Sequence, residues 1–172
     1  MQIIKKKKPF DYFLYTAIIL AGIVLDQLTK LLITTFMELG DSIPIIKNVL
    51  HITYWENSGA AFGMLSDRRW VFILVSTVTI IGLLIFLYLG HAQNRLYAIA
   101  ISLIISGGIG NMFDRLYLGY VIDFIDFQLI DFAIFNGADS FVCIGAGLLI
   151  LAMVLEVIDE AKKSKKDGEE KG

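Results

Sequence analysis

Four long apolar stretches constrain what this chain can fold into more than any other feature of its sequence. They run from about residue 12 to 36, 70 to 89, 96 to 113 and 140 to 158. An α-helix needs about 20 mostly apolar residues to cross the hydrocarbon core of a bilayer, and these stretches approach or exceed that length. We therefore predict an α-helical membrane protein with four transmembrane helices, built as one domain over residues 1–172. The charged, glycine-ended segment from about 159 to 172 predicts a disordered tail.

Composition supports this class of protein and excludes several others. Hydrophobic residues make up 56% of the chain, more than in an ordinary soluble domain. The single cysteine, Cys143, excludes an internal disulfide bond. The two histidines, His51 and His91, have no companion ligands, so we expect no metal and no cofactor. The lysine clusters flank apolar spans without interleaved aromatic residues, which argues against a nucleic-acid partner.

The first apolar stretch could be mistaken for a cleavable signal peptide, because basic residues precede it. It lacks a small-residue cleavage site, and its second half carries Asp26, Gln27 and Lys30, so we expect it to be retained as a span. Lysines crowd both ends of the chain, which predicts that both termini are cytoplasmic. The connections over about 37–69 and 114–139 then face outward, although Arg68 and Arg69 run against this rule.

The first outer connection has the residues of a small sheet. Turn-forming residues precede a run rich in β-formers and aromatic side chains that ends at Trp55. We predict one or two short strands between residues 42 and 55, with Tyr54 and Trp55 at the level of the lipid headgroups.

Polar residues that could carry chemistry gather between residues 107 and 140, at the outer margins of the last two spans. They comprise three carboxylates, two amides and one arginine, namely Asp114, Asp123, Asp139, Asn111, Asn136 and Arg115. A carboxylate beside an apolar segment is costly unless it is paired, so such a cluster indicates a function. Asp26 and Lys30 are four residues apart and share a helix face, where they can form a structural ion pair or serve the site.

Each acid also has a purely structural interpretation. Asp123 could be the outward residue of an alternating strand, and Asp139 could be only the N-cap of the fourth span. Asn57 with its glycine-rich sequel is typical of a tight turn with a helix cap. The residues Ser102, Ser106 and Gly110 recur every four positions, which permits close helix packing in lipid.

Two carboxylates that share one proton can activate a water and protonate a leaving amine, as in aspartic peptidases. Spacing alone does not show that Asp123 and Asp139 meet. A proton- or ion-coupled transporter using Asp26 and Lys30 is a rival, but most polar residues sit at one outer margin rather than near the midplane. A membrane adaptor that docks partners on its outer strands is another rival, and it leaves the acids unexplained.

Five motifs in order resemble the signal peptidase II family of bacterial membrane aspartic peptidases. They are Asp26-Gln27-x-Thr29-Lys30, Asn57-x-Gly59-Ala60-Ala61-Phe62-Gly63, Gly107-Gly108-x-Gly110-Asn111-x-x-Asp114-Arg115, Val121-x-Asp123-Phe124 and Phe135-Asn136-x-Ala138-Asp139-Ser140. The likeness covers nearly the whole chain between the lysine-rich ends. Ala133 and Gly137 depart from the usual pattern of the family beside the last motif.

The resemblance implies four membrane helices, a small extracytoplasmic β-cradle and a mobile outer loop or helix over the site. It implies that Asp123 and Asp139 are catalytic. It assigns supporting roles to Asp26, Lys30, Asn57, Gly59, Asn111, Asp114, Arg115, Asn136 and Ala138. The implied substrate is a diacylglyceryl-modified prolipoprotein cut just before its lipidated cysteine, so membrane lipid and globomycin-type inhibitors are expected partners.

Overall fold

The computed structural model describes residues 9–59, 69–89, 92 and 94–169, and side chains within 11–164 of these. Its four helices are α1 (Pro9–Phe36), α2 (Arg69–Tyr88), α3 (Arg95–Tyr117) and α4 (Gly137–Glu169). All four are long and apolar enough to cross a membrane, so the four predicted spans are confirmed. His91 and the glycine-rich motif beyond Gly59 lie outside the described residues.

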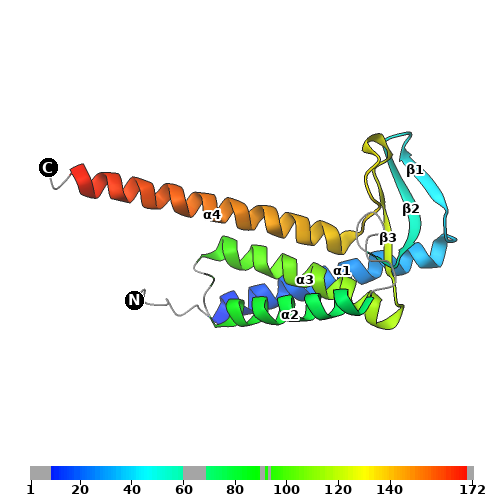
Figure 1. The fold of residues 1–172 in the computed structure, drawn as a ribbon, viewed down its shortest axis with the longest axis horizontal. Helices are drawn as coiled ribbons and strands as arrows, with labels where there is room; N and C mark the ends of the chain where they lie inside the picture. Colours follow the sequence, from blue (N-terminus) through cyan, green and yellow to red (C-terminus); the bar gives the residue numbers. More distant parts are fainter. Residues whose placement is uncertain (1–8, 60–68, 90–91, 93, 170–172) are drawn as a thin grey trace.

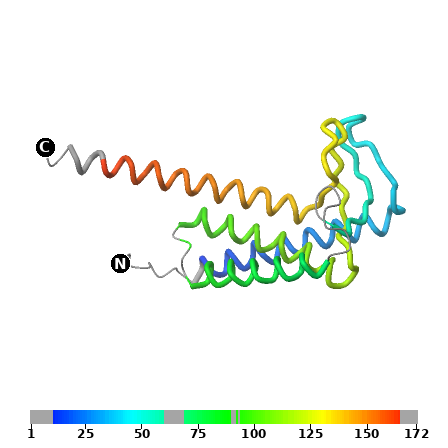
Figure 2. The backbone as a smooth tube through the Cα atoms, in the orientation of Figure 1, coloured from blue at the N-terminus to red at the C-terminus, as the bar shows by residue number. Residues whose placement is uncertain are grey.

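A small antiparallel sheet lies at one end of the helices (Figure 1). It consists of β1 (Ser42–Ile46), β2 (Leu50–Asn57) and β3 (Val121–Asp126), in the order β1-β2-β3. The expected strands of the first outer connection and the expected cradle are therefore confirmed. The third strand comes from the second outer connection, which places residues from both connections side by side. Figure 2 shows that the start of α1 and the end of α4 lie at the opposite end from the sheet.

Small side chains on α3 let two other helices approach it closely. Ser102, Ser106 and Gly110 are all buried. A Cβ atom added at Gly110 would lie 2.5 Å from Asp26 Oδ2 on α1 and 3.3 Å from Ala138 Cβ on α4. The small residues thus bring the polar segment of α1 and the start of α4 against the same turn of α3.

The end of α3 and the burial of Tyr54 differ from the sequence-based expectations. Helix α3 continues to Tyr117, past the expected end near residue 113, and the chain then turns through Gly119 at φ 92°. A left-handed φ of this kind favours glycine. Tyr54 is buried and donates a hydrogen bond to Glu56 at 3.0 Å, so its placement among the headgroups was wrong. Neighbouring strand residues face opposite sides, so only Trp55 is exposed.

The expectation of a disordered tail was wrong for residues 159–169, which continue α4 as a helix. Alanine, glutamate and lysine are strong helix formers and dominate this segment. Asp159 and Lys163 also stand four residues apart, a spacing that supports a helix.

Candidate active site

Asp123 is held on β3 by two side-chain amides. Its carboxylate is almost completely buried, with 1% of the residue exposed. Asn57 Nδ2 donates to Asp123 Oδ2 at 2.9 Å, and Asn136 Nδ2 donates to Asp123 Oδ1 at 2.7 Å. Asp123 therefore lies on a strand, as one interpretation had it, but it faces inward. Its two oxygens receive neutral donors only.

Burial raises the pKa of Asp123 from its ordinary value to about 7. The hydrogen bond from Asn57 acts in the opposite direction, and the nearby charge of Asp139 adds to the rise. The carboxyl group can therefore keep its proton up to neutral pH.

Asp139 lies in the first turn of α4 and is also held by two donors. Asn111 Nδ2 donates to Asp139 Oδ1 at 2.7 Å, and the backbone N–H of Asn136 donates to Asp139 Oδ2 at 3.2 Å. The N–H of Asp139 returns a bond to Asn136 Oδ1 at 3.0 Å. This is a capping box in which Asn136 is the N-cap and Asp139 is the third helical residue, so the interpretation of Asp139 as the N-cap was wrong.

Asn136 joins the two acids into one site. Its side chain donates to Asp123 and its backbone donates to Asp139. Asn136 is completely buried, so these bonds fix both carboxylates against the same residue. We call Asp123 and Asp139 the acid pair.

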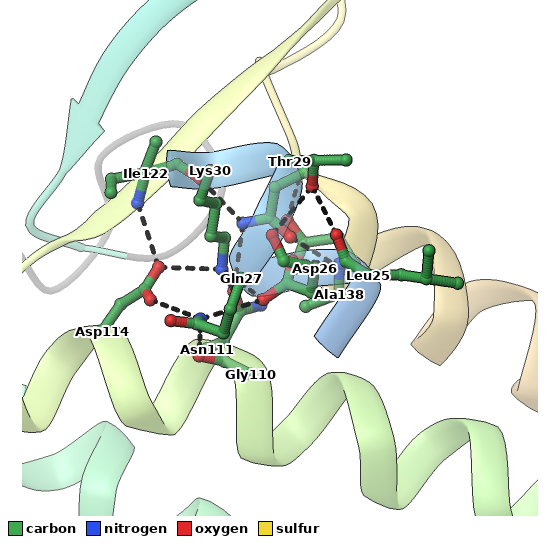
Figure 3. Close-up of polar contacts among 12 residues, drawn as sticks. Leu25, Asp26, Gln27, Thr29, Lys30, Gly110, Asn111, Asp114, Ile122 and Ala138 are labelled. Carbon is green, nitrogen blue, oxygen red and sulfur yellow. Dashed lines mark hydrogen bonds and ion pairs between the residues drawn. The ribbon is translucent and has the colours of Figure 1, made fainter. Parts of the chain in front are cut away.

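Behind the acid pair lies a second polar group, which we call the ionic cluster, made of Asp26, Lys30 and Asp114 (Figure 3). Lys30 Nζ lies 2.8 Å from Asp26 Oδ2 and 2.8 Å from Asp114 Oδ2. The cluster is sealed, because the side chains of all three residues are at most 2% exposed. Gln27 Nε2 adds a bond to Asp114 Oδ1 at 2.9 Å, which helps to satisfy the second acid.

Asn111 connects the ionic cluster to the acid pair. Its Oδ1 accepts from Lys30 Nζ at 3.0 Å and from Asn136 Nδ2 at 3.0 Å. Its Nδ2 donates to Asp139. The network is thus continuous from α1 through α3 to α4.

A cavity of about 710 Å³ opens onto the acid pair. Asp123, Asp139, Asn57, Asn111 and Arg115 supply polar groups to its wall. The remainder of the wall is largely apolar and comes from α2, α3, α4 and the segment before α4, including Phe72, Phe132, Ile134, Val142 and Ile144. The cavity can therefore take a mostly apolar molecule that presents one polar group to the acids.

Arg115 provides the positive charge beside this cavity. Its guanidinium donates to the backbone oxygen of Gly59 at 3.1 Å and to that of Asn111 at 3.3 Å. The same group lies 4.8 Å above the ring of Phe72. In turn the N–H of Gly59 donates to Asn57 Oδ1 at 3.0 Å, which directs the other end of that amide to Asp123.

The structure brings together all eleven residues that the sequence and the resemblance single out. Gly59 and Ala138 take part through their backbone groups. Arg115 donates to the backbone oxygen of Gly59, and the N–H of Ala138 donates to Asp26. Sequence reasoning gave no role to Gln27, although a second polar residue beside Asp26 in an apolar span was a usable signal. Within the described residues, no group of three or more histidine, cysteine, aspartate or glutamate side chains could hold a metal ion.

Two carboxylates that share a donor residue and open onto one apolar cavity form the arrangement of an aspartic peptidase. Comparisons with known proteins agree with this class. The sequence profile of the signal peptidase (SPase) II family matches residues 18–155. The chain therefore belongs to the signal peptidase II family and is a peptidase of that type.

Individual relatives are similar over almost their full length. A lipoprotein signal peptidase of Brevibacillus brevis is 49% identical over 146 residues, which are 84% of this chain and 95% of the relative. One from Staphylococcus carnosus is 43% identical over 162 residues, 92% of this chain and 99% of the relative. A bacterial membrane enzyme solved by the in meso method at 1.9 Å resolution superposes with a TM-score of 0.77 at 38% identity. That match covers 88% of this chain and 97% of the solved one.

Proposed function

We propose that this peptidase removes the signal peptide from diacylglyceryl-modified prolipoproteins, cutting just before the lipidated cysteine. The observation that carries the proposal is the acid pair, two carboxylates held by one buried asparagine at the wall of an apolar cavity. The relatives named lipoprotein signal peptidase support the substrate class. The apolar wall beside the acids suits a substrate that carries acyl chains, and by the family resemblance a globomycin-type inhibitor would occupy the same space.

In the mechanism that we propose, Asp139 is ionised and Asp123 carries the proton of the pair. The Asp139 carboxylate takes a proton from a water, whose oxygen attacks the scissile carbonyl carbon, while the Asp123 carboxyl group donates a hydrogen bond to the carbonyl oxygen. The carbon–nitrogen bond then breaks as the proton that Asp139 took from the water passes to the leaving nitrogen, which leaves a carboxyl group on one product and an amino group on the other and restores the acid pair. Both products form without any change in oxidation state. Asp123 can hold the shared proton at neutral pH, because burial raises its pKa to about 7.

We further propose that the protein lies in the bacterial cell membrane with both termini cytoplasmic and the site toward the outer face. Lysines cluster near both ends of the chain. Asp123 lies on β3 and Asp139 in the first turn of α4, and these elements meet at the opposite end of the helices from the start of α1 and the end of α4 (Figure 1). A lipid-anchored substrate must be met at the membrane surface, which fits this placement. Fusion of reporter domains to the two ends tests the orientation.

The test of the function is cleavage of a purified, diacylglyceryl-modified prolipoprotein in detergent micelles. We expect the wild type to cut before the lipidated cysteine, and Asp123→Asn and Asp139→Asn to lose activity about 10⁴-fold while remaining folded by thermal unfolding. Asp126→Asn is a matched control, because Asp126 lies on the same strand but binds Thr53 and Gln128 instead of the cavity. It should keep its activity within about threefold.

Two results would contradict the proposal. If a folded variant of either acid cuts at near wild-type rate, the acid pair is not catalytic, and Asp114 becomes the next acid to examine. If the wild type cuts an unlipidated precursor as well as the lipidated one, the diacylglyceryl group is not part of what the cavity recognises.

A further inference from the structure

The ionic cluster holds the backbone immediately before each member of the acid pair. The N–H of Ala138 donates to Asp26 Oδ1 at 2.9 Å. The N–H of Ile122 donates to Asp114 Oδ2 at 3.3 Å. Each of these two donors belongs to the residue that precedes one of the proposed catalytic aspartates. The two acids of the cluster therefore fix, from behind, the two chain segments whose separation sets the geometry of the acid pair (Figure 3).

Lys30 ties these two anchors together. An ammonium group has three N–H donors, and all three are used here. They face Asp26 Oδ2 at 2.8 Å, Asp114 Oδ2 at 2.8 Å and Asn111 Oδ1 at 3.0 Å. Since 1% of Lys30 is exposed, water does not compete for these donors. One nitrogen atom thus connects α1, the end of α3 and, through the acids, the starts of β3 and α4.

The third bond of Lys30 also helps to set which way the Asn111 amide points, together with the bond that Asn136 Nδ2 donates to the same oxygen. An ammonium can only donate, so the atom of Asn111 that faces it must be the oxygen. The amide nitrogen is then directed at Asp139 Oδ1, 2.7 Å away. Without the ammonium only Asn136 Nδ2 holds the Asn111 oxygen, so the amide that donates to Asp139 is fixed by one bond instead of two.

We propose that Lys30 is a positioning residue for the peptidase reaction, acting through Asp26, Asp114 and Asn111 on the spacing and hydrogen bonding of the acid pair. The inference rests on the proposed function of that pair. The competing explanation is that Lys30 only neutralises two buried acids so that the helices can pack. The two explanations differ in their effect on turnover, because a displacement of about 1 Å at reacting groups can lower a rate about 100-fold.

The test compares the double variant Lys30→Met with Asp26→Asn against Asp26→Asn alone. The double variant keeps the net charge of −1 that the two carboxylates and one ammonium give the wild-type cluster, and Asp26→Asn alone has a net charge of 0. Asparagine at position 26 still offers an oxygen to the N–H of Ala138. We expect both proteins to fold and the double variant to show a kcat about 100-fold below that of Asp26→Asn. KM should stay within about threefold, because Lys30 does not line the cavity.

A kcat within about threefold of the Asp26→Asn control, or a raised KM with an unchanged kcat, would overturn the proposal. If the double variant does not fold, Lys30→Arg decides, because it keeps the positive charge. A planar, longer guanidinium cannot reproduce the three short bonds, so we expect a folded protein with kcat lowered at least about 30-fold. Wild-type turnover in Lys30→Arg would overturn the proposal. These results are distinct from a failure of the proposed function, in which the wild type itself would not cut the lipidated substrate.

Discussion

Two pairs of carboxylates lie in the same polar network and have different surroundings. Asp26 and Asp114 share the ammonium of Lys30 at 2.8 Å each and are sealed from solvent. Asp123 and Asp139 share only amide donors and open onto the cavity. Both pairs are built from residues of different elements, and they lie one hydrogen-bonded asparagine apart. The pairs differ in two respects. Only Asp26 and Asp114 bind a cation, and only Asp123 and Asp139 line the cavity.

The difference shows what separates a structural acid pair from a reactive one. The two carboxylates of the ionic cluster face a shared ammonium and do not line the cavity, so a substrate does not reach them. Amides satisfy the oxygens without supplying a charge, which leaves the second ionisation of the pair unfavourable and one proton available. The cavity then gives water and a peptide bond access to that proton. In the proposed function, the ionic cluster supplies fixed geometry and the acid pair supplies the chemistry.

The largest effect on stability should come from removing the shared cation. Lys30→Met leaves two buried carboxylates without a cation, and breaking a buried ion pair typically costs about 3–5 kcal/mol. We expect its free energy of unfolding in micelles to fall by that amount, while Asp123→Asn changes stability by less than about 1 kcal/mol or raises it. Equal losses in the two variants would show that the pairs are not electrostatically different.

Close packing at Gly110 holds the ionic cluster against α3, and disturbing it should have the next largest effect. A Cβ atom there would meet Asp26 Oδ2 at 2.5 Å and Ala138 Cβ at 3.3 Å. Gly110→Ala should therefore destabilise the fold by about 1–3 kcal/mol and lower turnover as well. Gly147→Ala is the control. Gly147 also lies in a long apolar helix, α4, but a Cβ atom there meets nothing within 4 Å. A stable, fully active Gly110→Ala would show that α1 can shift freely.

The sequence was sufficient for the parts of this arrangement that depend on local pattern. Apolar runs of about 20 residues predicted the four spans, because a bilayer imposes that length on each helix separately. The i,i+4 spacing of Asp26 and Lys30 predicted their ion pair, which the structure shows at 2.8 Å. Contacts between residues far apart in the chain could not be predicted from such local patterns. Asp114 joins the same ammonium from 84 residues further along the chain, and no local spacing encodes that contact.

The spacing of residues in the sequence likewise did not predict that Asp123 and Asp139 lie in one site. Asp123 and Asp139 lie on a strand and a helix, and the residue that unites them, Asn136, precedes the helix. Only the resemblance to a known family selected this pair among the acids. The register of β2 against β3, which pairs Trp55 with Asp123 and Asn57 with Val121, places the Asn57 amide beside the acid. Register depends on packing across both strands, so the sequence of one strand does not determine it.

The pH dependence of stability should report the raised pKa of Asp123 in the acid pair. The pKa of Asp123 is raised by burial to about 7 in the folded protein, above its ordinary value of 3.8. An acid of this kind favours the folded state while both states hold the proton, and that contribution is lost as the pH rises through the folded pKa. The wild type should therefore lose stability relative to Asp123→Asn between about pH 4 and pH 7. Parallel stability curves from thermal unfolding would contradict the raised pKa.

Replacing Asn57 should change the pKa of Asp123 further, with a smaller effect than the substitutions above. The hydrogen bond from Asn57 Nδ2 favours the ionised form of Asp123 and so lowers its pKa. In Asn57→Leu we expect the pKa of Asp123, and with it the basic limb of the pH profile of kcat, to move up by about 1 pH unit. The profile is measured with the lipidated substrate. A basic limb that stays in place would mean that Asp123 does not carry the proton of the pair.

The smallest effect is expected at an ion pair that lacks burial. Arg95 lies 3.0 Å from Asp11 near the ends of α3 and α1, and the arginine side chain is 67% exposed. Water and salt screen such a pair, and exposed pairs typically contribute less than about 1 kcal/mol. Arg95→Gln should therefore change the free energy of unfolding by less than that amount and leave turnover unaltered. The contrast with Lys30→Met tests whether burial, rather than the mere presence of opposite charges, makes the ionic cluster important. A loss in Arg95→Gln as large as that in Lys30→Met would remove the physical basis of the comparison, because screening would then play no part.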